Sequence, residues 1–307
     1  MESLHPKLIK KILRSIAKES ILRAEKQEAQ VLGLDEELEG GTYNVEQPPE
    51  GFKPPFLMVV VDGNIGSGKT TFLTACEKLM SAQQIIISKE NVDAFHEELK
   101  AFYGDRSPKN AVALENAVLD ETCRRFNTVM RGDLSEKIVV FERFFESVSM
   151  FVSVNAGTYG ATKEESNAEE LKLLKRAARN MKKARKILGS NPLNCYLMVG
   201  AQSCLERIKK RDRDGEEFIT LEYLQKLENR HSEFFSTRPY VCGFDDPWEK
   251  VIAECSRFTI PGIMLSTDKT DEEGTPEIPS EALMEFLERV IWFRQLCSLV
   301  KQLLRFR

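Results

Sequence analysis

The chain has 307 residues, of which 42% are hydrophobic and 30% charged, which suits one large domain or one domain with an extension. Its net charge of −4 argues against a broadly basic surface, so no nucleic-acid partner is expected. No apolar run reaches the roughly 18 residues of a membrane span, so no such span is expected. Seven cysteines without a CxxC pair and three histidines without ligand spacing argue against a zinc site. The odd number of cysteines, without a disulfide pattern, favours a reducing compartment. The cytoplasm is expected, and the mitochondrion and nucleus are left open.

Residues 1–55 are expected to form an N-terminal extension. Leu8, Ile12 and Ile16 have helical spacing, and basic residues occupy the other face, so residues 1–34 are predicted to form an amphipathic helix. This helix either packs on the chain's own core or docks on a membrane or partner. An acidic linker rich in Gly and Pro follows, and the main domain, residues 56–307, is predicted to begin near Phe56. Removal of residues 1–50 is therefore expected to leave a folded protein.

Short apolar runs alternate with helical patterns after residue 55. Strands are expected at 56–61, 84–88, 137–141, 194–199 and 260–265. Helices are expected at 69–81, 92–103, 110–130, 144–157, 165–188, 203–211, 220–237 and 281–304. This alternation predicts an α/β fold with a parallel five-stranded sheet and helices on both faces.

A phosphate-binding motif follows the first expected strand. The residues matching GxxxxGK[ST] are Gly63, Asn64, Ile65, Gly66, Ser67, Gly68, Lys69 and Thr70, with Thr71 directly after them. Glycines allow backbone amides to approach phosphate oxygens, and the N-terminus of the next helix favours anions. Lys69 is expected to reach the outer phosphates and Thr70 to ligate Mg²⁺. The motif predicts a P-loop NTPase-type fold that binds a nucleoside triphosphate.

Three charged residues end the second and third expected strands. Glu90, Glu142 and Arg143 should face the P-loop, because ligands of parallel sheets gather at the carboxyl ends of the strands. One carboxylate could accept a proton from an attacking hydroxyl, and Glu142 could help to hold Mg²⁺. The alternative is that each residue caps a helix or forms a surface ion pair.

A cluster of arginines marks a candidate lid at about residues 207–219. Arg207, Arg211 and Arg213 lie at a predicted helix end and in the loop after it. Arginines on a mobile lid can stabilise a phosphoryl group during transfer. The segment taken alone equally fits a solvated run of charges.

These motifs together resemble the deoxyribonucleoside kinase family. The resemblance rests on GNIGSGKTT, ENVDAF, ERFFES and RIKKRDRDGEEFITLEYLQKL, and it covers about residues 56–240 well and 260–295 loosely. It implies that Glu90 is the general base for a 5′-hydroxyl and that Arg143 orients this base and the sugar. It assigns Tyr103 and Glu216 to the 3′-hydroxyl, with the register of Glu216 ambiguous against Glu217. It also implies ATP as phosphate donor, Mg²⁺ as cofactor, a loop near the adenine that begins at Asp268, and a homodimer through helices 110–130 and 144–157.

The expected base pocket departs from the family pattern. Phe95 replaces the usual tryptophan, and Glu115 falls at the position of the glutamine that reads the base edge, with Asn116 possible after a one-residue slip. Phe144 replaces the serine of E-R-S, and Val148 stands where an acid occurs in one branch of the family. The sequence thus predicts a divergent member, with its base preference left open.

The predicted activity is ATP-dependent 5′-phosphorylation of a deoxyribonucleoside. One alternative is a nucleoside monophosphate kinase of the thymidylate kinase type, whose acceptor is an anionic phosphate. The other is a non-catalytic relative with the same fold, although a scaffold would need none of Lys69, Thr70, Glu90 or the lid arginines.

Overall fold

The computed structural model describes residues 43–55, 57–79, 85–134, 137–155, 163–189, 192–236 and 262–266. The predicted helices at 1–34 and 281–304, and the loop that begins at Asp268, lie outside the described residues.

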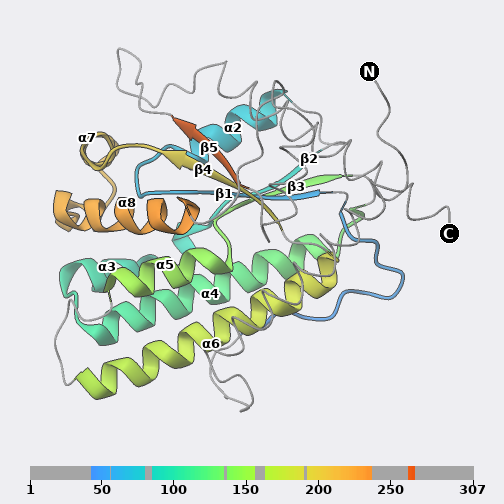
Figure 1. Ribbon diagram of the computed structural model, residues 1–307, viewed down its shortest axis with the longest axis horizontal. Coiled ribbons are helices and arrows are strands. Elements are labelled where there is room, and N and C mark those ends of the chain that lie inside the picture. The colour runs from blue at the N-terminus through green and yellow to red at the C-terminus, as the bar shows by residue number, and fades with distance from the viewer. Residues whose placement is uncertain are drawn as a thin grey trace.

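A parallel sheet forms the centre of the molecule (Figure 1). Its strands are β1 (Leu57–Gly63), β2 (Ile85–Ser88), β3 (Ile138–Glu142), β4 (Leu193–Met198) and β5 (Gly262–Ser266), in the order β2-β3-β1-β4-β5. Every pairing is parallel, with β1 between β3 and β4. The predicted α/β fold with a parallel sheet is confirmed.

Helices connect the strands. They are α2 (Lys69–Leu79), α3 (His96–Gly104), α4 (Pro108–Met130), α5 (Phe145–Asn155), α6 (Lys163–Leu188), α7 (Ala201–Arg211) and α8 (Leu221–Ser236), with short 3₁₀ turns η1 (Val92–Phe95) and η2 (Glu216–Phe218). Ser107 caps α4 by accepting a hydrogen bond from Asn110 N at 3.4 Å, and Pro108 occupies its first turn.

One predicted helix is divided in two. The single helix expected at 92–103 is instead η1 followed by α3, because Phe95 has a non-helical φ of −139°. The Phe95 side chain is buried at this break and lies against the central cavity. Hydrophobic periodicity runs through both pieces, so the sequence pattern did not reveal the break.

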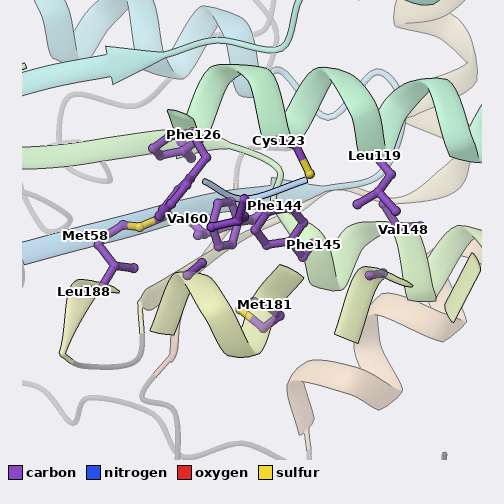
Figure 2. Packing of buried hydrophobic residues seen from close by; sticks show 14 of the residues in the cluster. Met58, Val60, Leu119, Cys123, Phe126, Phe144, Phe145, Val148, Met181 and Leu188 are labelled. Carbon is purple, nitrogen blue, oxygen red and sulfur yellow. The ribbon is translucent and has the colours of Figure 1, made fainter. Parts of the chain in front are cut away.

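The two faces of β1 are covered by different helices. Val59 and Val61 pack with Phe72 and Leu73 of α2 on one face. Met58 and Val60 face the other side, where α4, α5 and α6 lie beneath the sheet (Figure 1). Figure 2 shows the aromatic centre of this second core, in which Phe126, Phe144 and Phe145 lie beside Met58 and Val60. The burial of β1 on both faces explains its continuous apolar sequence.

Part of the predicted linker belongs to this second core. Val45 is 5% exposed, and its backbone N–H donates to Asn180 Oδ1 of α6 at 2.8 Å. Glu46 N donates to Asn127 Oδ1 of α4 at 3.0 Å, and Asn127 Nδ2 donates to Asn44 O at 2.9 Å. The boundary predicted near Phe56 therefore falls after residues that already contribute to the core.

Candidate active site

A cavity of about 580 Å³ opens beside the P-loop at the carboxyl ends of the strands. Its wall includes residues that follow β2 and β3, one side of α4, and the α7–η2 connection. The predicted site residues that line it are Ile65, Gly66, Gly68, Lys69, Thr70, Thr71, Glu90, Phe95, Tyr103, Glu115, Glu142, Arg143, Val148, Arg207, Arg211, Arg213 and Glu216. Gly63, Asn64 and Ser67 are not part of its wall, and the Asn64 and Ser67 side chains are buried within the P-loop.

Close packing requires glycine at two positions of the P-loop. A Cβ on Gly63 would lie 2.6 Å from Ser67 Oγ and 2.9 Å from Leu197 O of β4. Gly66 has a φ of +78°, and a Cβ there would lie 2.7 Å from Cys204 O of α7. The loop is thus held between β4 and α7, while Asn64 Nδ2 donates to Leu224 O of α8 at 2.9 Å.

Lys69 is buried at the inner end of the P-loop. Its Nζ donates to Gly63 O at 3.1 Å and to Asn64 O at 2.8 Å. Burial lowers its pKa to about 8, and the Arg143 guanidinium contributes, while Glu142, Glu90 and Asp62 oppose the shift. An anionic phosphate in the cavity would favour the charged ammonium, so ligand binding and Lys69 protonation should be coupled.

Thr70 and Glu142 form a pair of oxygen ligands suited to Mg²⁺. Thr70 Oγ1 donates to Glu142 Oε1 at 2.8 Å, and Glu90 N donates to Glu142 Oε2 at 3.3 Å. Mg²⁺ prefers oxygen ligands and usually retains several waters beside one or two protein groups and substrate phosphates. No group of three or more His, Cys, Asp or Glu side chains forms a metal cage within the described part of the chain. The pair is compatible with a cation held mainly by phosphate and water.

Glu90 and Arg143 face each other across the cavity wall. Arg143 Nη1 lies 3.1 Å from Glu90 Oε2 and 3.4 Å from Oε1. Arg143 has a φ of +53°, which is rare for a residue with a side chain, and its N–H donates to Val61 O at 2.9 Å. Its guanidinium also lies 4.7 Å from the centroid of the Phe151 ring. The unusual backbone turn directs the cation into the site, where it holds the Glu90 carboxylate.

The opposite part of the cavity is mainly apolar. Phe95, Tyr103 and Val148 are at most 5% exposed, and they line the cavity together with Glu115, which is also buried. Burial raises the pKa of Tyr103, and the nearby Glu216 raises it further, so its hydroxyl stays protonated and can donate a hydrogen bond. The cavity therefore combines a phosphate-binding end with an apolar end that could accept a ring.

The lid arginines are organised around Glu216. Arg211 donates to the Glu216 carboxylate through Nε at 2.7 Å and through Nη2 at 2.5 Å. Arg213 Nη1 lies 3.7 Å from Glu216 Oε1. Glu216 is buried and lines the cavity, whereas Glu217 is exposed, so the structure places Glu216 at the site. Arg207 is 6% exposed and reaches the P-loop, 3.5 Å from Ser67 O. The segment is thus not simply a solvated run of charges.

A comparison with known protein families covers the whole of the cavity wall. The deoxynucleoside kinase family matches residues 59–287. The chain belongs to this family. It is a kinase, and kinases of this family use ATP as phosphate donor.

Relatives of this deoxynucleoside kinase differ in the base that they are named for. The thymidine kinase of Ictalurid herpesvirus 1 (strain Auburn) is 28% identical over 194 residues, which are 62% of this chain and 78% of that protein. The deoxyadenosine kinase of Dictyostelium discoideum is 26% identical over 183 residues, or 57% of this chain and 65% of that protein. Human mitochondrial thymidine kinase 2 is 28% identical over 182 residues, or 58% of this chain and 63% of that protein. The chain spans less than two thirds of the length of this deoxyadenosine kinase and of human thymidine kinase 2.

A buried network behind the P-loop was missed by sequence reasoning. Asp62 Oδ2 accepts from Ser147 Oγ at 2.6 Å, and Asp62 Oδ1 accepts from Gly63 N at 2.7 Å. His231 Nε2 of α8 lies 3.4 Å from Asp62 Oδ1, and its Nδ1 lies 2.7 Å from Leu227 O. Burial alone would raise the pKa of Asp62, but His231, Arg143 and Ser147 together hold it below its ordinary value. Asp62 directly before the P-loop was the only available signal, because nothing local indicates that His231 meets it.

The structure adds two further features to the kinase site. Lys210 also lines the cavity, and Ser147 provides a hydroxyl three residues after Phe144, which itself belongs to the hydrophobic core. Phe144 N donates to Ser147 Oγ at 3.2 Å.

Among the described helices, none combines the length and apolarity needed to cross a bilayer.

Proposed function

We propose that this kinase transfers the γ-phosphoryl group of ATP to the 5′-hydroxyl of a deoxyribonucleoside. The observation that carries the proposal is the Glu90 carboxylate, held by Arg143 in a cavity that continues from the P-loop to an apolar pocket. A neutral acceptor hydroxyl needs a base at this position, and a carboxylate oriented by a guanidinium can accept its proton. The family membership supports nucleoside phosphorylation in general.

Glu90 accepts the proton of the 5′-hydroxyl as its oxygen attacks the γ-phosphorus. Arg143 holds Glu90 in place through the contact between its guanidinium and the carboxylate. Lys69 lies beside the outer phosphates, and Arg207, Arg211 and Arg213 surround the phosphoryl group in transfer. In phosphoryl transfer, positioning and electrostatic stabilisation of the spread charge account for most of the catalysis.

Thr70 and Glu142 would hold Mg²⁺ in this scheme. When bound, the cation neutralises charge on the β- and γ-phosphate oxygens. Thr70 contributes its hydroxyl oxygen and Glu142 a carboxylate oxygen, and the present hydrogen bond between them keeps both oxygens close together.

The apolar end of the cavity would receive the nucleoside. Tyr103 and Glu216 would contact the 3′-hydroxyl, since both line the cavity and the charge of Glu216 acts on the Tyr103 hydroxyl. Phe95 and Val148 would contact the base ring, with Glu115 at its polar edge. A homodimer through α4 and α5 stays a prediction from the family resemblance.

Purified protein should be incubated with ATP, Mg²⁺ and each of four deoxynucleosides or four deoxynucleoside monophosphates in turn. The proposal expects phosphorylation of at least one nucleoside and none of the monophosphates. Lys69→Ala is the matched control, because it removes the phosphate-binding ammonium and should abolish product. Phosphorylation of monophosphates alone would support the monophosphate kinase alternative, and no product with any acceptor would support a non-catalytic relative.

A further inference from the structure

We propose that Glu115 reads the nucleobase as a neutral carboxylic acid, offering one donor and one acceptor to the base edge. This inference rests on the proposed function, because it concerns the specificity of the same cavity. It adds a chemical rule for the accepted base: one donor must lie next to one acceptor on its pairing edge.

The location of Glu115 carries the argument. The residue lies on α4, lines the apolar end of the cavity, and is 4% exposed. Within the described part of the chain no group donates a hydrogen bond to its carboxyl, and the causes of its pKa shift include no hydrogen bond. A buried ionised carboxylate without a hydrogen-bond donor is strongly unfavourable. The carboxyl is thus available to a ligand and prefers its neutral form.

The neighbouring charges do not supply a partner. Arg143 is engaged by Glu90 at 3.1 Å, and the negative charge of Glu90 disfavours a second carboxylate nearby. Among the described residues, the charges that act on Glu115 are those of Arg143 and Glu90, which follow β3 and β2, and Glu170 of α6 lines a small second cavity with it. Two of these three groups are acids and one is a cation. Burial first, and Glu90 in addition, raise the pKa of Glu115 to about 8 against the opposing effect of Arg143.

The protonation state of Glu115 decides which base edges it can satisfy. A neutral acid donates through its O–H and accepts through its C=O, as an amide does, whereas a carboxylate only accepts. Cytosine presents an acceptor (N3) beside an amino donor, and adenine presents the same pair at N1 and N6. Guanine presents a donor–acceptor pair, N1–H and O6, and it alone also presents two adjacent donors, N1–H and the 2-amino group, which suit a carboxylate. Cytosine and adenine therefore require neutral Glu115, whereas guanine can bind the ionised form.

The test is the ratio of kcat/KM for deoxycytidine or deoxyadenosine to that for deoxyguanosine, measured at several pH values. The ratio cancels pH effects that all nucleosides share, such as those of Lys69, and kcat/KM reports the free enzyme. With a pKa of about 8, the ratio should fall between about pH 7 and about pH 8.5. The ratio should fall about 4-fold if deoxyguanosine binds equally well to neutral and ionised Glu115. It should fall about 30-fold if deoxyguanosine binds only to ionised Glu115. Glu115→Gln is the matched control, because its amide keeps the donor and acceptor at all pH values and should give a constant ratio.

Stability provides a second readout that does not depend on activity. Because the folded state raises the pKa of this acid above its unfolded value of 4.5, the wild type should lose stability relative to Glu115→Gln as pH rises from about 5 to about 8. A wild-type ratio that is constant with pH, or one that changes equally in the variant, would overturn the proposal while leaving the proposed function intact. Failure to phosphorylate any nucleoside would overturn both. The wild-type ratio decides the matter alone if the variant does not fold.

Discussion

The contribution of residues 43–50 to the fold can be measured with two truncations. One variant lacks residues 1–42 and the other lacks residues 1–50, so their difference isolates the segment that contains Val45 and Glu46. Both variants retain the P-loop and the whole cavity, because the first cavity-lining residue is Ile65. The comparison therefore tests folding without removing catalytic groups.

The structure allows the size of the effect to be worked out. Loss of buried Val45 costs about 1.5 kcal/mol of apolar burial. Asn180, which is 1% exposed, and Asn127, which is 7% exposed, each lose a backbone partner, and an unsatisfied buried polar group costs about 1–3 kcal/mol. Water can reach both amides once the covering segment is removed, so the lower values apply. A total of about 3–5 kcal/mol is a large part of a typical stability of about 5–15 kcal/mol.

Urea unfolding and thermal melting of the two truncations provide the assay. The shorter variant should melt at least about 6 °C lower, since 1 kcal/mol shifts Tm by about 2–4 °C in a domain of this size. Phosphorylation of the best nucleoside at low temperature should persist in both variants wherever they remain folded. Melting temperatures within about 2 °C of each other would refute the assignment of residues 44–46 to the core.

Three further predictions concern the site itself. Glu90→Gln should bind ATP normally but lower kcat by about 10²–10⁴-fold, and a near-normal kcat in steady-state assays would remove Glu90 from the role of base. Arg211→Ala should lower kcat more than it raises the nucleoside KM, because charge on the moving phosphoryl grows in the transition state; an effect on KM alone would make Arg211 a ground-state binding residue. Asp62→Asn should reduce stability at neutral pH by about 2–5 kcal/mol through loss of the charged partner of His231. Because folding lowers the pKa of Asp62 from 3.8, the wild-type advantage should be present above about pH 4 and diminish as pH falls further. Urea titrations across this range check the sign, and an equal difference at every pH would contradict it.

Sequence patterns were sufficient where the relevant physics is local. The P-loop follows from the residue types that a tight phosphate-binding turn requires, and the strands follow from short apolar runs buried on both faces. The convergence of Glu90, Glu142 and Arg143 also follows from sequence, because parallel strands end at the same edge of the sheet. The three residues do line one cavity, with Glu90 and Arg143 in direct contact.

Tertiary structure was needed wherever residues far apart in the chain meet. Val45 packs against α4 and α6, although the composition of its segment, rich in Gly, Pro and acidic residues, predicts a linker. The prediction missed this contact because local composition does not report burial by distant helices. The pairing of Asp62 with His231 depends on how α8 packs against β1, and no local pattern encodes that contact. The phosphate-binding loop and the α/β fold could be predicted without the structure, because both depend on residue type and periodicity. Long-range packing places Glu216 rather than Glu217 at the cavity and buries Glu115 without a hydrogen-bond donor among the described residues, so neither feature could be read from local sequence.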